Sequence, residues 1–276
     1  MQPPIPEAFS PYLRRWALRP DGAPIRSHAG CLLPVRRDGQ PLMLKVSHEI
    51  DERQGAVLMR WWDGEGAARV IEADEDAILL ERATGDRSLA AMARNGRDDE
   101  ATAILCDVAA VLHQPRGKPL PDLIPLQVWF AELEPVARSV GGILTRSAAV
   151  ARARLAAPCE CCVLHGDLHH GNVLDFGPRG WLAIDPKRLY GDRAFDYANI
   201  FCNPDMDDAA VPVATRPERF AARLQIVSAR SGIEPRRLLE WIIAWTGLSA
   251  AWIIADGDDP AVDLAVANLA AAALDA

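Results

Sequence analysis

One short segment, residues 165–172, restricts what this chain can fold into more than any other part of the sequence. It reads His-Gly-Asp-Leu-His-His-Gly-Asn and is followed by Asp185. The apolar run 162–164 precedes it, and the runs 173–176 and 181–184 are separated by Gly-Pro-Arg-Gly. This pattern predicts strand, loop, strand, turn and strand. We therefore expect Asp167 and Asn172 on a loop at a strand end, with Asp185 returned by the hairpin to the side of Asn172.

The predicted arrangement suits phosphoryl transfer. Mg²⁺ on nucleotide phosphates takes hard oxygen ligands, usually only one or two of them from protein, and Asn172 and Asp185 are predicted to supply these. A second carboxylate that is free of metal can accept the proton of an attacking hydroxyl, and we assign this role to Asp167. His165 is expected to position the loop by hydrogen bonding.

These segments resemble those of known kinases. The pattern His-x-Asp-x-x-x-x-Asn with an Asp one hairpin later resembles the catalytic and metal-binding segments of protein-kinase-like folds. The Gly after the His, and Asp-Pro in place of Asp-Phe-Gly, look more like the aminoglycoside phosphotransferase branch. The segments His-Gly-Asp-Leu-His-His-x-Asn and Gly-Trp-Leu-x-Ile-Asp-Pro are similar to the streptomycin 6-kinase (aminoglycoside/hydroxyurea kinase) family. Gly191, Phe195, Ala198-Asn199 and Pro204 extend that similarity.

The resemblance covers most of the chain and is strongest over 162–204. It implies an α+β, two-lobed protein-kinase-like fold, with a small antiparallel-sheet N-lobe and a large, mainly helical C-lobe. It also implies ATP and Mg²⁺ as cofactors. The implied acceptor is a small molecule, an aminoglycoside such as streptomycin, phosphorylated at its 6-hydroxyl.

The N-terminal part carries the nucleotide-binding residues that the resemblance implies. The apolar strand 41–46 contains Lys45, and a helix predicted over 50–62 contains Glu52. By resemblance, Lys45 contacts the nucleotide phosphates and pairs with Glu52, with Asp51 as the alternative partner. The loop 27–30, Ser-His-Ala-Gly, departs from the glycine-rich loop of protein kinases, so the choice between ATP and GTP stays open.

The segment 78–83 resembles the hinge that joins the two lobes of a kinase. There the backbone of Glu81 and Ala83 would hydrogen-bond the adenine edge. An edge strand that ends at a turn explains the same residues equally well.

Residues beyond 87 show the 3.6-residue periodicity of helices. The predicted helices span 88–95, 98–114, 126–140, 143–157, 194–203, 216–231, 234–255 and 260–274. The change from strands to helices near residue 84 predicts an N-terminal lobe, 1–83, and a C-terminal lobe, 84–276.

An aminoglycoside is a polycation, so its binding cleft should present carboxylates near the base. Asp205 and Asp207 are the best candidates for substrate contacts, although acidic loop residues are often only solvated. Asp196 is expected to be structural and to hold the catalytic loop through its backbone. The sequence does not decide whether Lys187 touches phosphate or points away.

Composition narrows the remaining possibilities. The net charge of −8 argues against nucleic-acid or anionic-membrane partners. The longest uncharged run, 241–255, is shorter than the ~20 residues of a membrane span and predicts a buried helix.

The N-terminus has no signal-peptide pattern. Six irregularly spaced cysteines, most of them in apolar runs, predict buried free thiols. We expect a cytoplasmic protein.

Rival functions remain open. In a metal-dependent hydrolase, the ligands of Zn²⁺ or a metal pair would come from His165, Asp167, His169, His170 and Asp185. A non-catalytic pseudokinase usually lacks the Lys, Asp or Asn, and this chain keeps all three. A kinase for a non-antibiotic hydroxyl compound would share the chemistry and differ only in the acceptor.

Overall fold

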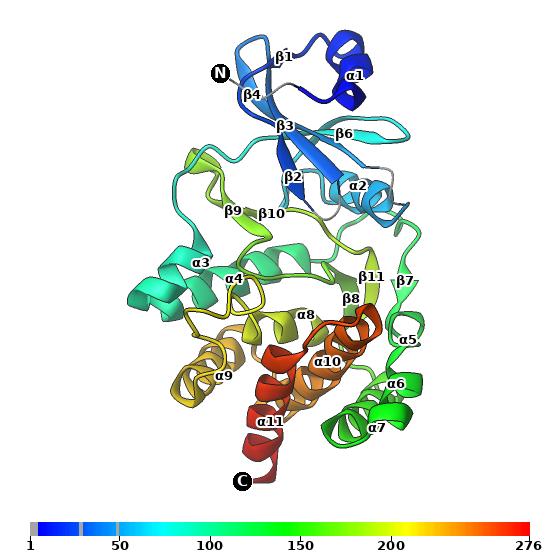
Figure 1. Ribbon diagram of the computed structural model, residues 1–276, viewed down its shortest axis with the longest axis vertical. Helices are drawn as coiled ribbons and strands as arrows, with labels where there is room; N and C mark the ends of the chain where they lie inside the picture. Colours follow the sequence, from blue (N-terminus) through cyan, green and yellow to red (C-terminus); the bar gives the residue numbers. More distant parts are fainter. Residues whose placement is uncertain (1–4, 28–29, 48–49) are drawn as a thin grey trace.

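The computed structural model describes residues 5–27, 30–47 and 50–276, and within the helix over 50–62 it describes side chains from Gly55 onward. A β-sheet lobe lies above a larger helical lobe, with the N-terminus at one end of the molecule and the C-terminus at the other (Figure 1). This architecture confirms the predicted two-lobed α+β fold.

The N-lobe is built on one antiparallel sheet of six strands in the order β1-β3-β4-β6-β5, with β2 paired to β3. A turn at Asp38 and Gly39, both with positive φ (50° and 83°), joins β3 to β4 as the Asp-Gly pair predicts. The strands are β1 Arg19–Pro20, β2 Ile25–Ser27, β3 Gly30–Arg37, β4 Gln40–Val46, β5 Val70–Ala73 and β6 Ala77–Glu81.

Alternating apolar side chains form the core of this sheet. Leu33 and Val35 of β3 and Leu42 and Leu44 of β4 are buried on one face, because successive side chains on a strand point to opposite faces. Phe9, from the short helical segment η1 Glu7–Phe9 that precedes α1 Ser10–Arg15, closes this cluster.

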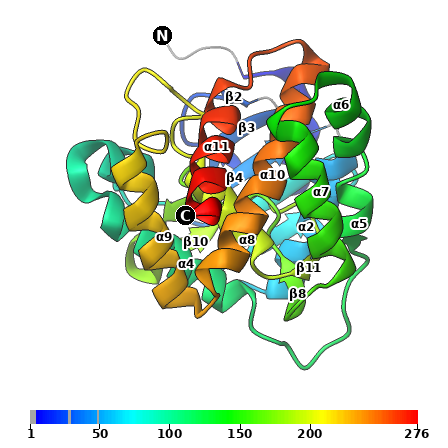
Figure 2. The same cartoon turned by 90° about the horizontal axis from the view of Figure 1, so that it is seen from below.

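The C-lobe surrounds a long apolar helix, α10. Seen from below, α10 runs beside α7 and α11 (Figure 2), and it also contacts α6, α8 and α9. By length and composition α10 could cross a membrane, but 72% of its most apolar window is buried inside the protein, as expected for a core helix. The helices are α3 Leu89–Met92, α4 Asp98–Leu112, α5 Leu126–Trp129, α6 Leu133–Val140, α7 Ile143–Ala156, α8 Phe195–Ala198, α9 Pro217–Ser231, α10 Pro235–Asp256 and α11 Ala261–Asp275.

Short strands in the C-lobe carry the 162–192 region. β9 and β10 form the predicted hairpin, with Val173 opposite Ala183, and β11 pairs with both β8 and β7. Their bounds are β7 Ile124–Pro125, β8 Cys161–Leu164, β9 Val173–Asp175, β10 Trp181–Ala183 and β11 Leu189–Asp192.

Two predicted helices are interrupted. The helix expected over 126–140 is split into α5 and α6, because Pro135 has no backbone N–H and its ring would clash with the carbonyl of Ala131. The helix expected over 88–95 becomes α3 and an irregular turn, η2 Ala93–Arg97, because Asn95 and Gly96 leave helical geometry.

Helix α2 Ile50–Trp62 links the two lobes. Ala56 and Met59 pack with Ile78 and Leu80 of the sheet. Leu58, Trp61 and Trp62 belong to the main core of the helical lobe. The sheet ends at Glu81 and the next helix begins at Leu89, so the change of structure falls near residue 84. The division into lobes 1–83 and 84–276 stays a prediction, since the end of α2 packs in the C-lobe core.

Replacing Trp62 tests this packing. Trp62 is fully buried, and its indole N–H donates to the carbonyl of Leu112 at 3.2 Å. Trp62→Ala is expected to lower the free energy of unfolding, measured in urea, by about 3–5 kcal/mol, because it leaves a large cavity. Val57→Ala, at a position on the same helix that is 45% exposed, is the control and should cost under about 1 kcal/mol. A similarly small loss for Trp62→Ala would contradict this role of α2.

Candidate active site

The hairpin brings the predicted site residues together. Asp167 and Asn172 lie on the loop between β8 and β9, and the backbone N–H of Ile184 donates to the carbonyl of Asn172 at 2.9 Å. Asp185 therefore follows directly beside Asn172, as the sequence pattern predicts. The backbone N–H of Lys187 donates to the carbonyl of His165 at 2.7 Å, so the chain after Asp185 is tied back to the loop 165–172, the predicted catalytic loop.

Two side-chain amides hold the carboxylate of Asp167. Oδ1 accepts a hydrogen bond from Nδ2 of Asn199 at 2.8 Å, and Oδ2 accepts one from Nδ2 of Asn172 at 3.1 Å. Nε2 of His169 lies 3.8 Å from Oδ1. The side chain is still 32% exposed, so a substrate hydroxyl can approach it.

Asn172 and Asp185 suit a hard divalent cation. The amide nitrogen of Asn172 donates to the carbonyl and to the carboxylate of Asp167, which leaves its Oδ1 as the atom available to a metal. Asp185 adds a carboxylate that is 31% exposed. An amide oxygen and one carboxylate are the donors with which Mg²⁺ is held beside phosphates, so these two residues fit the predicted ion.

Lys45 lies next to the proposed metal ligands. It is in β4, opposite Ile78 of β6, and its ammonium donates to Oδ1 of Asp185 at 2.8 Å with only 5% of its side chain exposed. The predicted partner, Glu52, and the alternative, Asp51, are on α2, but their side chains lie outside the described residues. Asp185 is therefore the acidic partner of Lys45 that the described residues provide.

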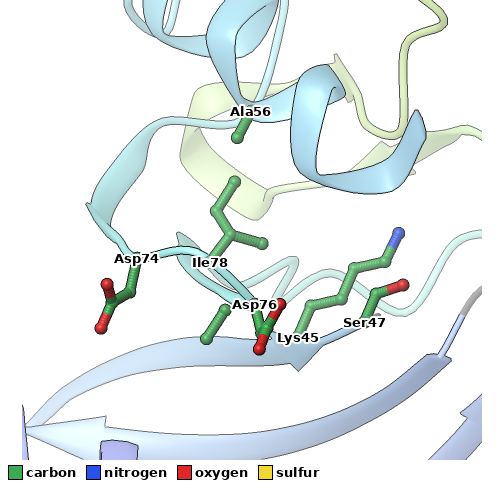
Figure 3. Close-up of a pocket in the computed structure, with 7 residues that line it drawn as sticks. Lys45, Ser47, Ala56, Asp74, Asp76 and Ile78 are labelled. Atoms are coloured by element: carbon green, nitrogen blue, oxygen red, sulfur yellow. The ribbon is translucent and has the colours of Figure 1, made fainter. Parts of the chain in front are cut away.

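Figure 3 shows the side chains that surround a small cavity beside Lys45. Ile78 points from the sheet toward Ala56 of α2, the side chain of Lys45 extends from the neighbouring strand, and Asp74 and Asp76 lie at the end of the same sheet. The cavity among these side chains has a volume of only ≈ 20 Å³, room for about one water molecule. This space is too small for a nucleotide.

The hinge prediction concerns backbone groups at the end of β6. The N–H of Glu81 already donates to the carbonyl of Arg69 at 3.0 Å. The Glu81 carboxylate is held by the backbone N–H of Arg69 and by the guanidinium of Arg179. Ala83 is partly buried in the cluster between the lobes. Adenine binding by Glu81 and Ala83 stays a prediction.

His165 is buried beneath the catalytic loop. Its Nδ1 accepts from the backbone N–H of Asp167 at 3.2 Å and its Nε2 lies 2.8 Å from the carbonyl of Ile184, which assigns the proton to Nε2. Burial lowers the pKa of His165 below its ordinary value of 6.5, although the carboxylates of Asp196 and Asp167 oppose this shift. A neutral ring therefore links the catalytic loop to the strand end before Asp185.

Asp196 holds the loop, as expected. Its carboxylate accepts from the backbone N–H groups of His165 and Gly166, both at 2.7 Å, and lies 2.8 Å from Nε2 of His113. The contact with His113 could not be found from the sequence, because 83 positions separate the two residues. The contact of Asn199 with Asp167 was also not predicted; Asn199 begins the 3-10 helix η4 Asn199–Phe201, which directly follows α8.

The two substrate candidates differ. Asp205 is buried, and its carboxylate accepts from the backbone N–H groups of residues 213–215 at 2.8–3.1 Å. This bonding organises the loop and corrects the predicted substrate contact of Asp205. Asp207 is exposed, and its Oδ2 lies 3.7 Å from the point where a Cβ on Gly171 would stand, so it faces the catalytic loop.

The rival zinc site is not assembled. Within the described part of the chain, no three or more His, Cys, Asp and Glu side chains are grouped so that they could hold a metal ion. Nδ1 of His169 instead accepts from the N–H of Gly171 at 3.2 Å. All six cysteines are free, and Cys159 and Cys161 are exposed, which corrects the expected burial of these two thiols.

A sheet lobe with a buried lysine, a helical lobe and an Asp/Asn loop beside a second Asp define a phosphotransferase of the protein-kinase-like class. The model of the aminoglycoside/hydroxyurea antibiotic resistance kinase family matches residues 15–257, and the chain belongs to that family.

Three known proteins illustrate this relationship. A streptomycin 3''-kinase of Klebsiella pneumoniae is 56% identical over 267 residues, 95% of this chain and 100% of that protein. A streptomycin 6-kinase of Streptomyces glaucescens is 33% identical, over 97% of this chain and 89% of that protein. A solved thermostable mutant of an aminoglycoside phosphotransferase, in a ternary complex with ADP and hygromycin B, has a TM-score of 0.65 at 14% identity, over 96% and 98% of the two chains. The last likeness supports the fold alone.

The protonation state of His165 can be measured. Its depressed pKa predicts that the ring is neutral and Nε2-protonated at neutral pH and titrates below 6.5 in the folded protein, whereas in the urea-unfolded chain it titrates near 6.5. The neutral ring therefore stabilises the fold fully above about pH 6.5, and this contribution is lost as the pH falls toward the folded pKa. Ring ¹⁵N chemical shifts of folded and unfolded protein test this, and a folded midpoint at or above 6.5 would contradict it.

Proposed function

We propose that this protein transfers the γ-phosphoryl group of ATP to streptomycin, at the 3''-hydroxyl. The observation that carries the choice of hydroxyl is the 56% identity to a streptomycin 3''-kinase along that protein's whole length. The 6-kinase relative is only 33% identical, so we propose the 3''-hydroxyl in place of the 6-hydroxyl expected from sequence motifs.

Asp167 is proposed to receive or orient the proton of the acceptor hydroxyl. Its partly exposed carboxylate is held by two amides, so it presents a fixed acceptor to the substrate. Because the transition state of phosphoryl transfer is largely dissociative, orienting the hydroxyl in line is itself a catalytic contribution. His165 keeps the loop in place from beneath.

The nucleotide is proposed to bind between Lys45 and the end of the β9–β10 hairpin. Lys45 would contact the phosphates, with Glu52 and the backbone of Glu81 and Ala83 as the further nucleotide contacts. Asn172 and Asp185 would hold Mg²⁺, which when bound offsets the negative charge of the phosphates. The Lys45–Asp185 pair supports this proposal, because it places the cation for the phosphates and the metal ligand 2.8 Å apart.

Asp207 is proposed as a contact for the cationic acceptor. It is exposed beside the catalytic loop, and a carboxylate there would attract the positively charged groups of streptomycin. The net charge of −8 favours such a small cationic partner over nucleic acid or an anionic membrane. We also propose that the protein works in the cytoplasm, where ATP is available.

An ADP-release assay with Mg²⁺ and ATP over a panel of aminoglycosides and small polyols tests the proposed function. Streptomycin is expected to be turned over, and fragment masses should place the phosphate on the doubly primed ring. Asp167→Ala is expected to lower kcat by at least about 10²-fold, because the group that accepts or orients the proton is lost. Asp259→Ala, at an exposed position, should be as active as the natural protein.

Each contrary outcome has one meaning. Phosphate on the unprimed ring would overturn the 3'' assignment and keep streptomycin as the acceptor. Turnover of a polyol but of no aminoglycoside would replace the acceptor class. Near-normal kcat in Asp167→Ala would remove Asp167 from the reaction.

The role of Asp207 predicts a separate change in substrate affinity. Asp207→Asn should raise KM for streptomycin at least about 10-fold, the effect of losing one charge-assisted contact, with KM for ATP unchanged. Asp259→Asn removes the same charge elsewhere and is the control. An unchanged KM for streptomycin in Asp207→Asn would show that Asp207 is only solvated.

A further inference from the structure

We propose that Asn199 is a positioning residue that holds the carboxylate of Asp167, and that Asn203 fixes the direction in which the Asn199 amide faces. This inference rests on the proposed phosphotransferase function and adds two residues to its machinery. Neither asparagine is placed to touch the substrate, because Asn199 is 3% exposed and Asn203 is 2% exposed.

Three hydrogen bonds form a directed chain that ends on the base. Nδ2 of Asn203 donates to the side-chain Oδ1 of Asn199 at 2.8 Å and to the backbone carbonyl of Asn199 at 3.2 Å. Nδ2 of Asn199 then donates to Oδ1 of Asp167 at 2.8 Å.

The direction of each amide follows from what its neighbours can do. A backbone carbonyl can only accept, so the carbonyl of Asn199 requires the nitrogen of the Asn203 amide to face it. That nitrogen can only donate, so the side-chain atom of Asn199 that it meets must be oxygen. The remaining atom, the nitrogen of Asn199, therefore faces Asp167. The reverse orientation would oppose oxygen to carboxylate and nitrogen to nitrogen.

A buried ion pair holds the backbone at which this chain of hydrogen bonds begins. The fully buried guanidinium of Arg223 donates to the backbone carbonyls of Ile200 and Asn203, both at 2.7 Å. The same guanidinium is paired with the carboxylate of Asp98, which is also buried. The backbone that carries Asn199 and Asn203 is thus tied to α4 and α9.

This arrangement decides the orientation of the Asp167 carboxylate. Asn199 holds Oδ1 and Asn172 holds Oδ2, so the plane of the carboxylate is fixed by one amide on each side. Without Asn199, Oδ1 would lose its hydrogen bond, and the carboxylate would rotate away from the attacking hydroxyl. Such a loss affects kcat, since the binding of neither substrate depends on Asn199.

The test is a double-mutant cycle. Asn199→Ala is expected to lower kcat roughly 10- to 100-fold, with KM for streptomycin and for ATP within about twofold of the natural values. In the Asp167→Ala background, the same change should cause no further loss, because Asn199 acts only through Asp167. The control is Asn268→Ala, at an exposed asparagine of α11, whose amide donates to the backbone carbonyl of Leu264.

Asn203→Ala is the second variant, in case Asn199→Ala does not fold. It removes the bonds that orient Asn199, together with a weak contact of the same amide with Sδ of Met206 at 3.9 Å, and we expect a smaller fall in kcat with unchanged KM values. An unchanged kcat in Asn199→Ala, or an equal further loss in the Asp167→Ala background, would overturn the proposal. If the natural protein does not phosphorylate streptomycin, the proposed acceptor fails, and the cycle is run with the acceptor that is turned over.

A measurement independent of turnover completes the test. The chain has five asparagines, so ¹⁵N-asparagine labelling gives few side-chain amide signals, from Asn95, Asn172, Asn199, Asn203 and Asn268. The Asn199 signals, identified by their loss in Asn199→Ala, should shift in Asp167→Ala. Signals that stay in place would overturn the contact.

Discussion

The buried carboxylate of Asp196 is the interaction on which the catalytic loop depends. The loop leaves β8 inside the protein, where backbone N–H groups must find partners, and Asp196 accepts two of them, from His165 and Gly166. Leaving a buried donor of this kind unsatisfied costs about 1–3 kcal/mol. Asp196 is on α8, a helix whose four residues are all buried, so the loop is attached to the interior of the C-lobe.

The position of this loop in turn determines the other contacts of the site. Asp196 holds the backbone of His165, and the His165 ring hydrogen-bonds the carbonyl of Ile184. This bond fixes the end of the β9–β10 hairpin against the loop. The next residue, Asp185, then meets the ammonium of Lys45. A single path of polar contacts thus runs from a helix of the C-lobe to a strand of the N-lobe.

Much of the site was predictable because its residues are close in sequence. The hairpin between Asn172 and Asp185 depends only on two short apolar runs and a Gly-Pro turn, and the β9–β10 register confirms it. The hairpin turn at Asp38 and the extent of α2 were predictable for the same local reason. Pro135, by contrast, broke a helix whose apolar pattern continues on both sides of it.

Contacts between distant residues could not be predicted. Asp205 and Asp207 are both acidic loop residues, and only the folding of residues 213–215 over Asp205 separates a buried carboxylate from an exposed one. The Lys45–Asp185 pair spans 140 positions. Asn199 lies 32 positions from Asp167, and no local periodicity indicates that their side chains meet.

Helix α2 also determines how the two lobes can move. Its final turn is anchored in the C-lobe core by Trp61 and Trp62, while Ala56 and Met59 pack with Ile78 and Leu80 of the sheet. At Gly55 the helix backbone passes so close to Pro186 that a Cβ there would stand 2.9 Å from the carbonyl oxygen of Pro186. Helix α2 therefore packs against both lobes, so any movement of one lobe relative to the other would have to change one of these two sets of contacts.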